Sequence, residues 1–338
     1  MKFSKKYMNL EEGIKKEWII TNGIGGYSSS TIIGCNTRKY HGLLVAPLSP
    51  PARRFVVLSK LDEAIIINNE NTPLYTNMCK NYISEGYKKL ENFEKEYFPI
   101  FTYKVKDTTI KKIVCMEYGK NTVCVYYKIK NGNYNAKLTL APIVNFRDFH
   151  TMNTNHQYNV KQNTNYQKVK IVLDNFIEHP IYFNSTDGKY IEHENDYFKN
   201  MYYLEEEKRG FYPEEDLYVP GHYEIDVDKN EEKEICFVCS LEENIEELNV
   251  KEIINKEIIR INKLIIQSEL IDIKKETDSK TDKEYREFIK DYIIASDNFI
   301  VNRPRFNLHT IIAGYPWFLD WGRDSMIAFE GLLLIPKR

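Results

Sequence analysis

From Glu17 to about Ser240 the apolar residues occur in short runs. Val, Ile, Tyr and Phe dominate these runs, and Asn, Gly, Asp and Pro separate them, which is typical of strands joined by turns. We predict strands at Glu17–Thr21, Ser29–Gly34, His41–Ala46, Arg54–Ser59, Asp62–Ile67, Phe98–Val105, Thr109–Glu117, Thr122–Ile129, Ala136–Ile143, Lys168–Asp174, Pro180–Asn184, Lys189–His193, His222–Val227 and Lys233–Cys239. Because no helical pattern interrupts this series, it predicts a mainly β fold, a large antiparallel β-sandwich.

The segment Thr108–Ile143 contains two turn sequences within this series. Gly119–Asn121 and Asn131–Asn133 combine Gly with Asn, and both residue types favour tight turns. We therefore predict that this segment is a meander of successive hairpins.

The pattern changes near Leu241. From Asn244 to Ser268, Ile, Leu and Val recur at three- and four-residue intervals among Glu and Lys, as in an amphipathic helix. The polar run Glu276–Lys283 predicts an exposed linker. A second helical pattern extends from Glu284 to about Val301, before Pro304 breaks it.

A third helix is predicted to begin near Asp324 and to continue into an apolar stretch. A helix this apolar normally needs partners, so the sequence favours a β domain followed by the opening of an α domain. We divide the chain into a β-sandwich domain (1–240), a helical linker (241–282) and the opening of that helical domain (283–338).

Composition and charge narrow the function classes. Lys and Arg total 47 and Asp and Glu total 49, without a basic block, so a nucleic-acid surface is disfavoured. No apolar run approaches the ~18 residues of a membrane span. The basic N-terminus lacks the apolar region of a signal peptide, so we expect a cytoplasmic protein that binds neither nucleic acid nor membrane.

Three motifs that suggest cofactors or metals have simpler interpretations. Asn22–Ser30 is glycine-rich, but strand-like residues follow it, so we predict a turn instead of a dinucleotide loop. Cys236 and Cys239 lie in an apolar strand, which predicts buried thiols. His193 lies between two Glu residues at a solvated strand end. We expect neither a cofactor nor a metal.

Two segments are unusually dense in chemically useful side chains. Asn36–Ala46 places Asn36, Arg38, Tyr40 and His41 before a buried strand, where they line a site or a domain interface, or form only a polar strand entrance. Ala313–Leu332 gathers aromatic, carboxylate and guanidinium groups before an apolar helix: Tyr315, Trp317, Asp320, Trp321, Arg323 and Asp324. Such groups bind sugars, because an aromatic face packs on pyranose C–H groups while Arg and Asp bond the hydroxyls. The alternative is a helix cap with Trp in the core.

Four segments of the sequence resemble the bacterial and archaeal-type glycogen debranching enzymes, the amylo-α-1,6-glucosidase family. They are Glu17–Ala46, Leu140–His150, Glu206–Gly221 and Ile311–Leu332, and they occur in the family's order. The resemblance implies an N-terminal β-sandwich joined by helices to an (α/α)6 toroid that carries the active site. The chain contains only the first helices of such a toroid, which is therefore incomplete here.

The resemblance also implies roles for residues of the last segment. Arg323 and Asp324 are expected to hold hydroxyls of the terminal glucose, with Trp321 beside them and Asp320 in a similar role. Glycoside hydrolysis needs a general acid and, in an inverting enzyme, a second carboxylate ~6.5–9.5 Å away. In related toroid enzymes both lie downstream of this segment, so we expect no catalytic residue in this chain.

The leading hypothesis is the N-terminal portion of a debranching enzyme that hydrolyses α-1,6-glucosidic branch points of glycogen or limit dextrin. Its partners would be a branched α-glucan and the remainder of the toroid. Two alternatives stay open: a non-catalytic glycan-binding or scaffolding sandwich, and a sandwich-plus-toroid glycosidase or phosphorylase that acts on another glucan.

Overall fold

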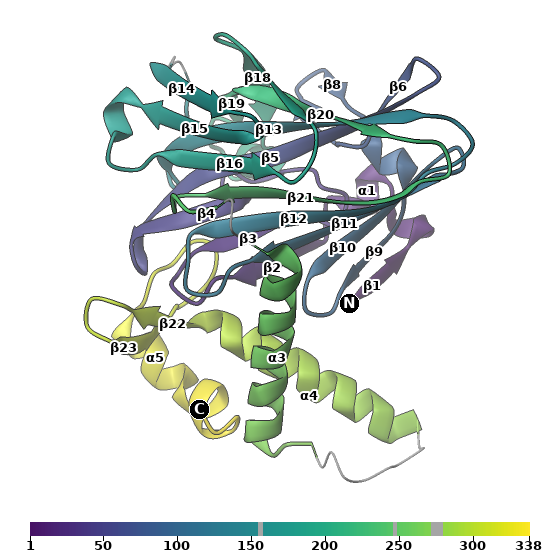
Figure 1. The fold of residues 1–338 in the computed structure, drawn as a ribbon. Coiled ribbons are helices and arrows are strands. Elements are labelled where there is room, and N and C mark those ends of the chain that lie inside the picture. The colour runs from purple at the N-terminus through teal and green to yellow at the C-terminus, as the bar shows by residue number, and fades with distance from the viewer. Residues whose placement is uncertain (155–157, 246–248, 272–279) are drawn as a thin grey trace.

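The computed structural model of the protein describes residues 1–154, 158–245, 249–271 and 280–338. Two large antiparallel sheets lie face to face, with long helices and a C-terminal segment of short elements on one side of them (Figure 1). The predicted mainly β fold with a large antiparallel sandwich is confirmed.

Sheet A contains nine strands in the described part of the chain. Their spatial order is β1 (Lys2–Ser4), β9 (Leu90–Lys95), β10 (Pro99–Val105), β11 (Thr108–Met116), β12 (Thr122–Lys130), β21 (Glu232–Ser240), β16 (Ile181–Ser185), β15 (Lys168–Leu173) and β14 (Val160–Asn165).

Sheet B contains ten strands among the described residues. Its main path is β17 (Lys189–Glu192), β20 (Gly221–Val227), β13 (Ala136–Asp148), β5 (Ala52–Ile67), β4 (Gly42–Ser49), β3 (Tyr27–Thr31) and β2 (Glu17–Thr21). Beside this path, β19 (Glu214–Tyr218) pairs with β13 and with β18 (Tyr197–Tyr202), and β6 (Glu70–Pro73) pairs with β5. Smaller elements are the β7–β8 pair (Met78–Cys79, Tyr82–Ile83), helices α1 (Leu10–Gly13) and α2 (Leu204–Lys208), and 3-10 turns at Lys5–Tyr7, Gly86–Lys89 and Asp174–Phe176.

The core lies between the two sheets. Phe93 and Phe101 of sheet A belong to the same buried cluster as Phe55, Phe146 and Ile225 of sheet B. Fully burying a side chain of this size stabilises the fold by about 1.5–3 kcal/mol. The alternating apolar residues of the predicted strands thus give the sandwich a core of its own.

The predicted meander is correct only in its first half. Strands β11 and β12 pair, but β12 pairs next with β21, and the chain crosses at Asn131 to sheet B. The buried Asn131 amide donates to the carbonyls of Val227 and Asp228 at 3.2 and 2.8 Å, while its oxygen accepts from Oγ1 of Thr108 at 2.8 Å. These bonds hold a crossover where a hairpin was predicted.

Strand β5 unites two predicted strands. Arg54–Ser59 and Asp62–Ile67 belong to this one element of 16 residues. Lys60, near the expected break, is buried, and its Nζ donates to the Thr76 carbonyl at 2.7 Å. A loop from elsewhere in the chain thus accepts its hydrogen bond, and Asp62 of the same strand, at 3.5 Å, provides the counter-charge. Further strands were not predicted, and the polar edge strand β14 shows why, since it has no apolar run.

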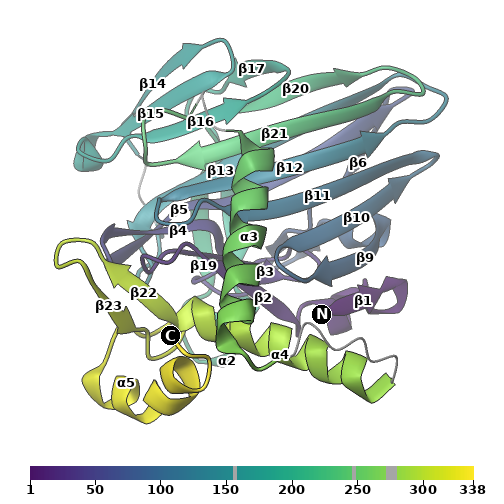
Figure 2. The same cartoon turned by 60° about the horizontal axis from the view of Figure 1, so that its bottom comes forward.

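Two long helices follow the sandwich (Figure 2). Helix α3 (Val250–Ser268) confirms the amphipathic pattern, although it begins later than predicted, with Asn249 accepting from the Glu252 backbone N–H at 3.2 Å. Residues of its first turns pack on sheet A, and Ile261 packs on Ile293 of helix α4 (Lys280–Phe299).

The ends of α4 differ from the prediction. Lys280–Lys283 are helical where a linker was expected, and the rest of that linker, Glu276–Ser279, lies outside the described residues. The helix stops at Phe299, and β22 (Ile300–Arg303) pairs with β23 (Leu308–Ile311). A short apolar run suits either a helix or a strand, and Asn307, whose φ is 49°, lets the chain reverse. The predicted third helix is α5 (Gly322–Phe329), followed by a π-helical turn at Glu330–Leu334.

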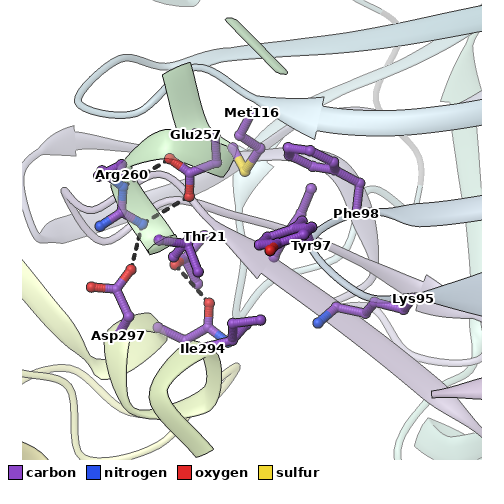
Figure 3. Close-up of a pocket in the computed structure, with 12 residues that line it drawn as sticks. Thr21, Lys95, Tyr97, Phe98, Met116, Glu257, Arg260, Ile294 and Asp297 are labelled. Carbon is purple, nitrogen blue, oxygen red and sulfur yellow. Dashed lines mark hydrogen bonds and ion pairs between the residues drawn. The ribbon is translucent and has the colours of Figure 1, made fainter. Parts of the chain in front are cut away.

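A polar cluster fastens the two helices to the sandwich (Figure 3). Arg260 of α3 donates to both carboxylate oxygens of Glu257, at 2.8 and 2.7 Å, and pairs with Asp297 of α4. Oγ1 of Thr21 in β2 donates to Asn298 Oδ1 at 3.1 Å. Asp297 is buried, so its pairing with Arg260 offsets the cost of removing both charges from water.

The glycine-rich start of the segment Asn22–Ser30 forms the predicted turn, which joins β2 to β3. Asn22 Oδ1 accepts from the backbone N–H groups of Ile24 and Gly26 at 3.2 and 2.8 Å. Gly23 has a φ of 73° and lies against the Tyr118 ring, which leaves no room for a Cβ atom. Its carbonyl accepts from the Asn302 backbone N–H at 2.8 Å, so the turn also contacts the C-terminal segment.

The remaining motifs have local roles. Cys239 is buried and Cys236 half-buried, and both are free thiols on β21. His193 follows β17 and is hydrogen-bonded to Asp196 and His222 at 2.8 and 2.9 Å. Among the described residues, no helix is both long and apolar enough to cross a membrane.

Candidate functional site

The segment Asn36–His41 is fixed by hydrogen bonds inside the sandwich. Asn36 accepts from Oγ of Ser30 at 2.8 Å and donates to the carbonyl of Ser59 at 3.2 Å. Nδ1 of His41 accepts from the backbone N–H of Thr37 at 3.1 Å. Asn36 and His41 are both buried, so these two side chains hold the shape of the loop.

A carboxylate from β2 joins this loop to the sheet. Oε1 of Glu17 accepts from Nε of Arg38 at 2.7 Å, and Oε2 lies 3.7 Å from Nε2 of His41. Burial alone would raise the pKa of Glu17, but His41 and Arg38 outweigh it and lower this pKa to about 2. Glu17 is therefore ionised at neutral pH, and it keeps Arg38 in one orientation.

The two dense segments of the sequence meet at Trp317. The guanidinium carbon of Arg38 lies 5.6 Å from the centre of the Trp317 ring, and the Tyr40 ring lies edge-on to it at 6.3 Å. The hydroxyl of Tyr40 is 3.2 Å from Nδ1 of His150. Trp317 and Tyr315 pack on Tyr40 and on a cluster on the outer face of sheet B. Arg38 and Tyr40 thus lie at the interface of the sandwich and the C-terminal segment.

Arg54 is a residue of this interface that the sequence did not indicate. It belongs to β5 and is 0% exposed, and its NH1 donates to the carbonyls of Pro316 and Phe318 at 3.2 and 3.0 Å. Its guanidinium carbon lies 4.7 Å from the centre of the Tyr315 ring and 5.6 Å from that of Phe149. A buried cation from the sandwich therefore holds the backbone of the Tyr315–Phe318 turn.

Asp320 is engaged within the C-terminal segment. Its Oδ2 pairs with Arg303 of β22 and accepts from Oγ1 of Thr310 in β23 at 3.1 Å, and its backbone forms a β-bridge with Ile312. This carboxylate ties the β22–β23 hairpin to the turn that precedes α5. The Asp320 carboxylate is therefore engaged by Arg303 and Thr310 of the same segment.

Trp321, Arg323 and Asp324 lie at the start of α5. The Trp321 side chain is 60% exposed, Arg323 is exposed and Asp324 half-buried. In the described part of the chain, neither the Arg323 guanidinium nor the Asp324 carboxylate forms a hydrogen bond or ion pair with another residue. An aromatic face, a donor fork and an acceptor are thus available together within four residues.

Asp324 also lines an apolar pocket of about 380 Å³ beneath α5. Ile312 and Ile327 line the same pocket, together with Phe299 and Tyr292 of α4. Among the described residues that line it, Asp324 is the one carboxylate. The pocket therefore does not contain the pair of carboxylates that glycoside hydrolysis requires.

The comparison with known families decides what kind of chain this is. The family described as glycogen debranching enzyme N terminal matches residues 16–234, which include most of the sandwich. The chain belongs to this family. A second family, described as amylo-alpha-1,6-glucosidase, matches residues 294–338, from the end of α4 through α5. The resemblance inferred from the sequence is thus confirmed.

Solved structures give more distant similarities to this debranching-enzyme family member. A protein assigned as a kojibiose phosphorylase, from the human microbiome, is 10% identical over 88% of this chain and 39% of its own, with a TM-score of 0.35. A bacterial glucoamylase complexed with acarbose is 13% identical over 78% of this chain and 36% of its own, with a TM-score of 0.38. The chain thus spans well under half the length of either protein. No curated protein sequence matches it.

In this debranching-enzyme family member, the sequence indicated the candidate site residues of the C-terminal segment but not Arg54, which binds the backbone of that segment. Tyr315, Trp317, Trp321, Arg323 and Asp324 are close in sequence and were predicted as a group. Arg54 follows Arg53 at the start of an apolar strand, which gives no signal, because its partners lie 262 and 264 residues later. In the described residues, no group of three or more His, Cys, Asp or Glu is arranged to hold a metal.

Proposed function

We propose that the chain is the N-terminal portion of an enzyme that hydrolyses α-1,6-glucosidic branch points of glycogen or limit dextrin. In this proposal residues 1–240 are the sandwich domain, 241–282 the helical linker and 283–338 the opening of the catalytic domain. The contact of Arg54 with the Tyr315–Phe318 turn carries the proposal, because it fixes the start of α5 relative to the sandwich.

Three side chains at the start of α5 would bind the terminal glucose. The Trp321 ring would pack on the apolar face of the pyranose. Arg323 would donate to two ring hydroxyls and Asp324 would accept from a third, since neither group bonds another of the described residues. Asp320 would act indirectly, because Arg303 and Thr310 already engage its carboxylate.

The hydrolytic step needs groups that the Asp324 pocket does not supply. A general acid must protonate the leaving oxygen, and a base must activate water on the other face of the sugar. We assign both to residues outside the 338 of this chain, in the remainder of an (α/α)6 domain. The substrate would be an uncharged branched α-glucan, which suits a net charge of −2.

Tryptophan fluorescence tests the binding half of the proposal. Trp18 is 3% exposed, whereas Trp321 is 60% exposed, so a glucan that packs on Trp321 should alter mainly its emission. We expect titration with maltotriose to give a saturable change that Trp321→Phe abolishes. Asp324→Asn should weaken it about tenfold, as loss of one charged hydrogen bond predicts. The control variant Trp317→Phe should keep the response.

Glucose release tests the catalytic half. The 338-residue chain should release no glucose from a branched limit dextrin, because it lacks the acid and the base. Release that Asp324→Ala abolishes would show that a complete carboxylate pair lies within these residues. Absence of any fluorescence response to glucans would instead contradict the proposed half-site.

A further inference from the structure

The outer face of sheet B carries a polar groove, separate from the apolar pocket beneath α5. It has a volume of about 630 Å³, within the range of about 300–1,000 Å³ for small-molecule sites. Its floor is a row of three side chains on adjacent strands, Ile66 of β5, Lys137 of β13 and Asp226 of β20. Its walls are the Asn68–Asn69 turn and the Asn133–Asn135 loop.

The side chains of this groove are polar and mostly uncharged. Asn68 and Asn69 both have positive φ and form the two-residue turn from β5 to β6. In the described part of the chain their amide groups bond no protein partner. Asn133 donates to Asp107 at 2.9 Å, and Asn135 accepts from the Lys229 backbone. Within the described ranges, the amide oxygen of Asn133 and the NH2 group of Asn135 bond no other residue.

An aromatic ring stands beside these amides. Tyr134 is 51% exposed, and its carbonyl accepts from Asn131 at 2.8 Å, which fixes the loop that carries the ring. Three charged side chains line the groove, Lys137, Lys229 and Asp226. Lys137 is paired with Glu224 at 2.7 Å, and Asp226 lies opposite Lys137 and forms no ion pair with another described residue. The lining thus has both charge signs, and a neutral polyhydroxylated ligand would find amide donors, acceptors and an aromatic face there.

We propose that the groove lined by Asn68, Asn69, Tyr134 and Asp226 is a second α-glucan-binding site, which holds the polymer away from the reacting branch. The proposal rests on the proposed function, since it takes the ligand to be a glucan. Strand β5 extends from the interface with the C-terminal segment, where Arg54 lies, to the groove, where Ile66 lies. At about 3.3 Å per residue, the 12 residue-to-residue steps from Arg54 to Ile66 span roughly 40 Å.

Native affinity electrophoresis in gels with and without glycogen tests this site. Wild-type protein should be retarded, and Tyr134→Ala should raise the apparent dissociation constant about fivefold, as loss of one aromatic contact predicts. Asn68→Ala combined with Asn133→Ala should weaken retardation similarly. The matched control is Tyr166→Ala, a tyrosine 87% exposed in the β14–β15 turn of the other sheet, which should behave as wild type.

The outcomes separate the two proposals. Equal retardation of wild type and Tyr134→Ala, with loss in Trp321→Ala, would overturn the groove and leave the proposed function standing. Absence of retardation in the wild type would overturn the groove, and the fluorescence titration at Trp321 would then decide the proposed function separately. Unfolding midpoints of Tyr134→Ala and Tyr166→Ala should match that of the wild type, because both side chains are exposed on turns.

Discussion

Two buried arginines on neighbouring strands of sheet B serve different regions. Arg147 of β13 is buried on the outer face of sheet B, within the sandwich domain, where NH2 donates to Glu215 at 2.9 Å and to the Lys39 carbonyl at 2.8 Å. Arg54 of β5 lies at the interface with the C-terminal segment, where it donates to two backbone carbonyls and packs on aromatic rings.

The two environments shift the pKa of the guanidinium group in opposite directions. Burial lowers the pKa of Arg54, with weaker opposing effects from nearby groups. Burial acts in the same sense on Arg147, but the carboxylate of Glu215 outweighs it and raises the pKa of that residue. The charge of Arg147 is thus balanced by a carboxylate of the same domain, whereas Arg54 is a cation whose hydrogen bonds go to a distant segment of the chain. Arg147 stabilises the sandwich domain, and Arg54 connects that domain to the C-terminal segment.

Removing the locally paired arginine should have the largest effect. Arg147→Ala leaves the Glu215 carboxylate buried and without its cation, which typically costs about 3–5 kcal/mol. We expect a loss of this size in the free energy of unfolding, measured by urea denaturation and circular dichroism. A loss smaller than that of Arg54→Ala would contradict the inference that the Arg147–Glu215 pair contributes more to stability than the interface contact of Arg54.

Removing the interface arginine should act mainly on the C-terminal segment. Arg54→Ala leaves no carboxylate unpaired, so we expect the free energy of unfolding to fall by about 1–2 kcal/mol, mainly from lost hydrogen bonds. Limited proteolysis should then trim the chain after Asn302 faster than in the wild type. Arg54→Lys is the control, since it keeps the charge without the fork. Cleavage first within the sandwich strands would contradict the domain boundary.

Acid should loosen the loop that carries Arg38. The pKa of Glu17 is lowered from 4.5 to about 2, so its stabilisation is fully present above about pH 4.5 and is lost as pH falls toward 2. The side chain is 33% exposed, and solvent screening limits the effect to about 1 kcal/mol. Glu17→Gln should flatten the stability profile in this pH window. An unchanged slope would show that the pairing with Arg38 and His41 contributes nothing.

The exposed tryptophan should matter least for stability. Trp321→Ala removes a ring that is 60% exposed, and we expect the unfolding free energy to change by less than about 0.5 kcal/mol. Trp18→Ala, in the core, should by contrast lower it by about 3–5 kcal/mol. Equal effects would mean that Trp321 is a packing residue.

The sequence predicted elements better than the connections between them. Apolar runs located most long strands and helix α3, because burial on one face imposes its period on the sequence. The crossover at Asn131 was missed, since a turn sequence does not specify which strand pairs next. The β22–β23 hairpin was missed because Ile300 and Val301 continue an apolar helix pattern.

The candidate site divides in the same way. Trp321, Arg323 and Asp324 were predicted because neighbouring residues of one segment formed a recognisable group. Arg54 could not be predicted, because its role depends on carbonyl groups of the Tyr315–Phe318 turn. Every residue has a backbone carbonyl, so the sequence does not indicate which carbonyls accept a hydrogen bond. Interfaces built from backbone acceptors are visible only in the structure.

Strand β5 has a consequence for how ligand size would affect affinity. It is a continuous element of 16 residues, so the distance between its ends is fixed by the sheet and not by a flexible linker. If glucan binds both at the start of α5, beside Trp321, and in the groove beside Tyr134, an oligosaccharide too short to span the two sites can occupy only one of them at a time. A polymer that reaches both makes its second contact intramolecularly, with an avidity that can exceed either affinity by about 10²–10⁴. Selection for large glucans would then come from the length of one strand.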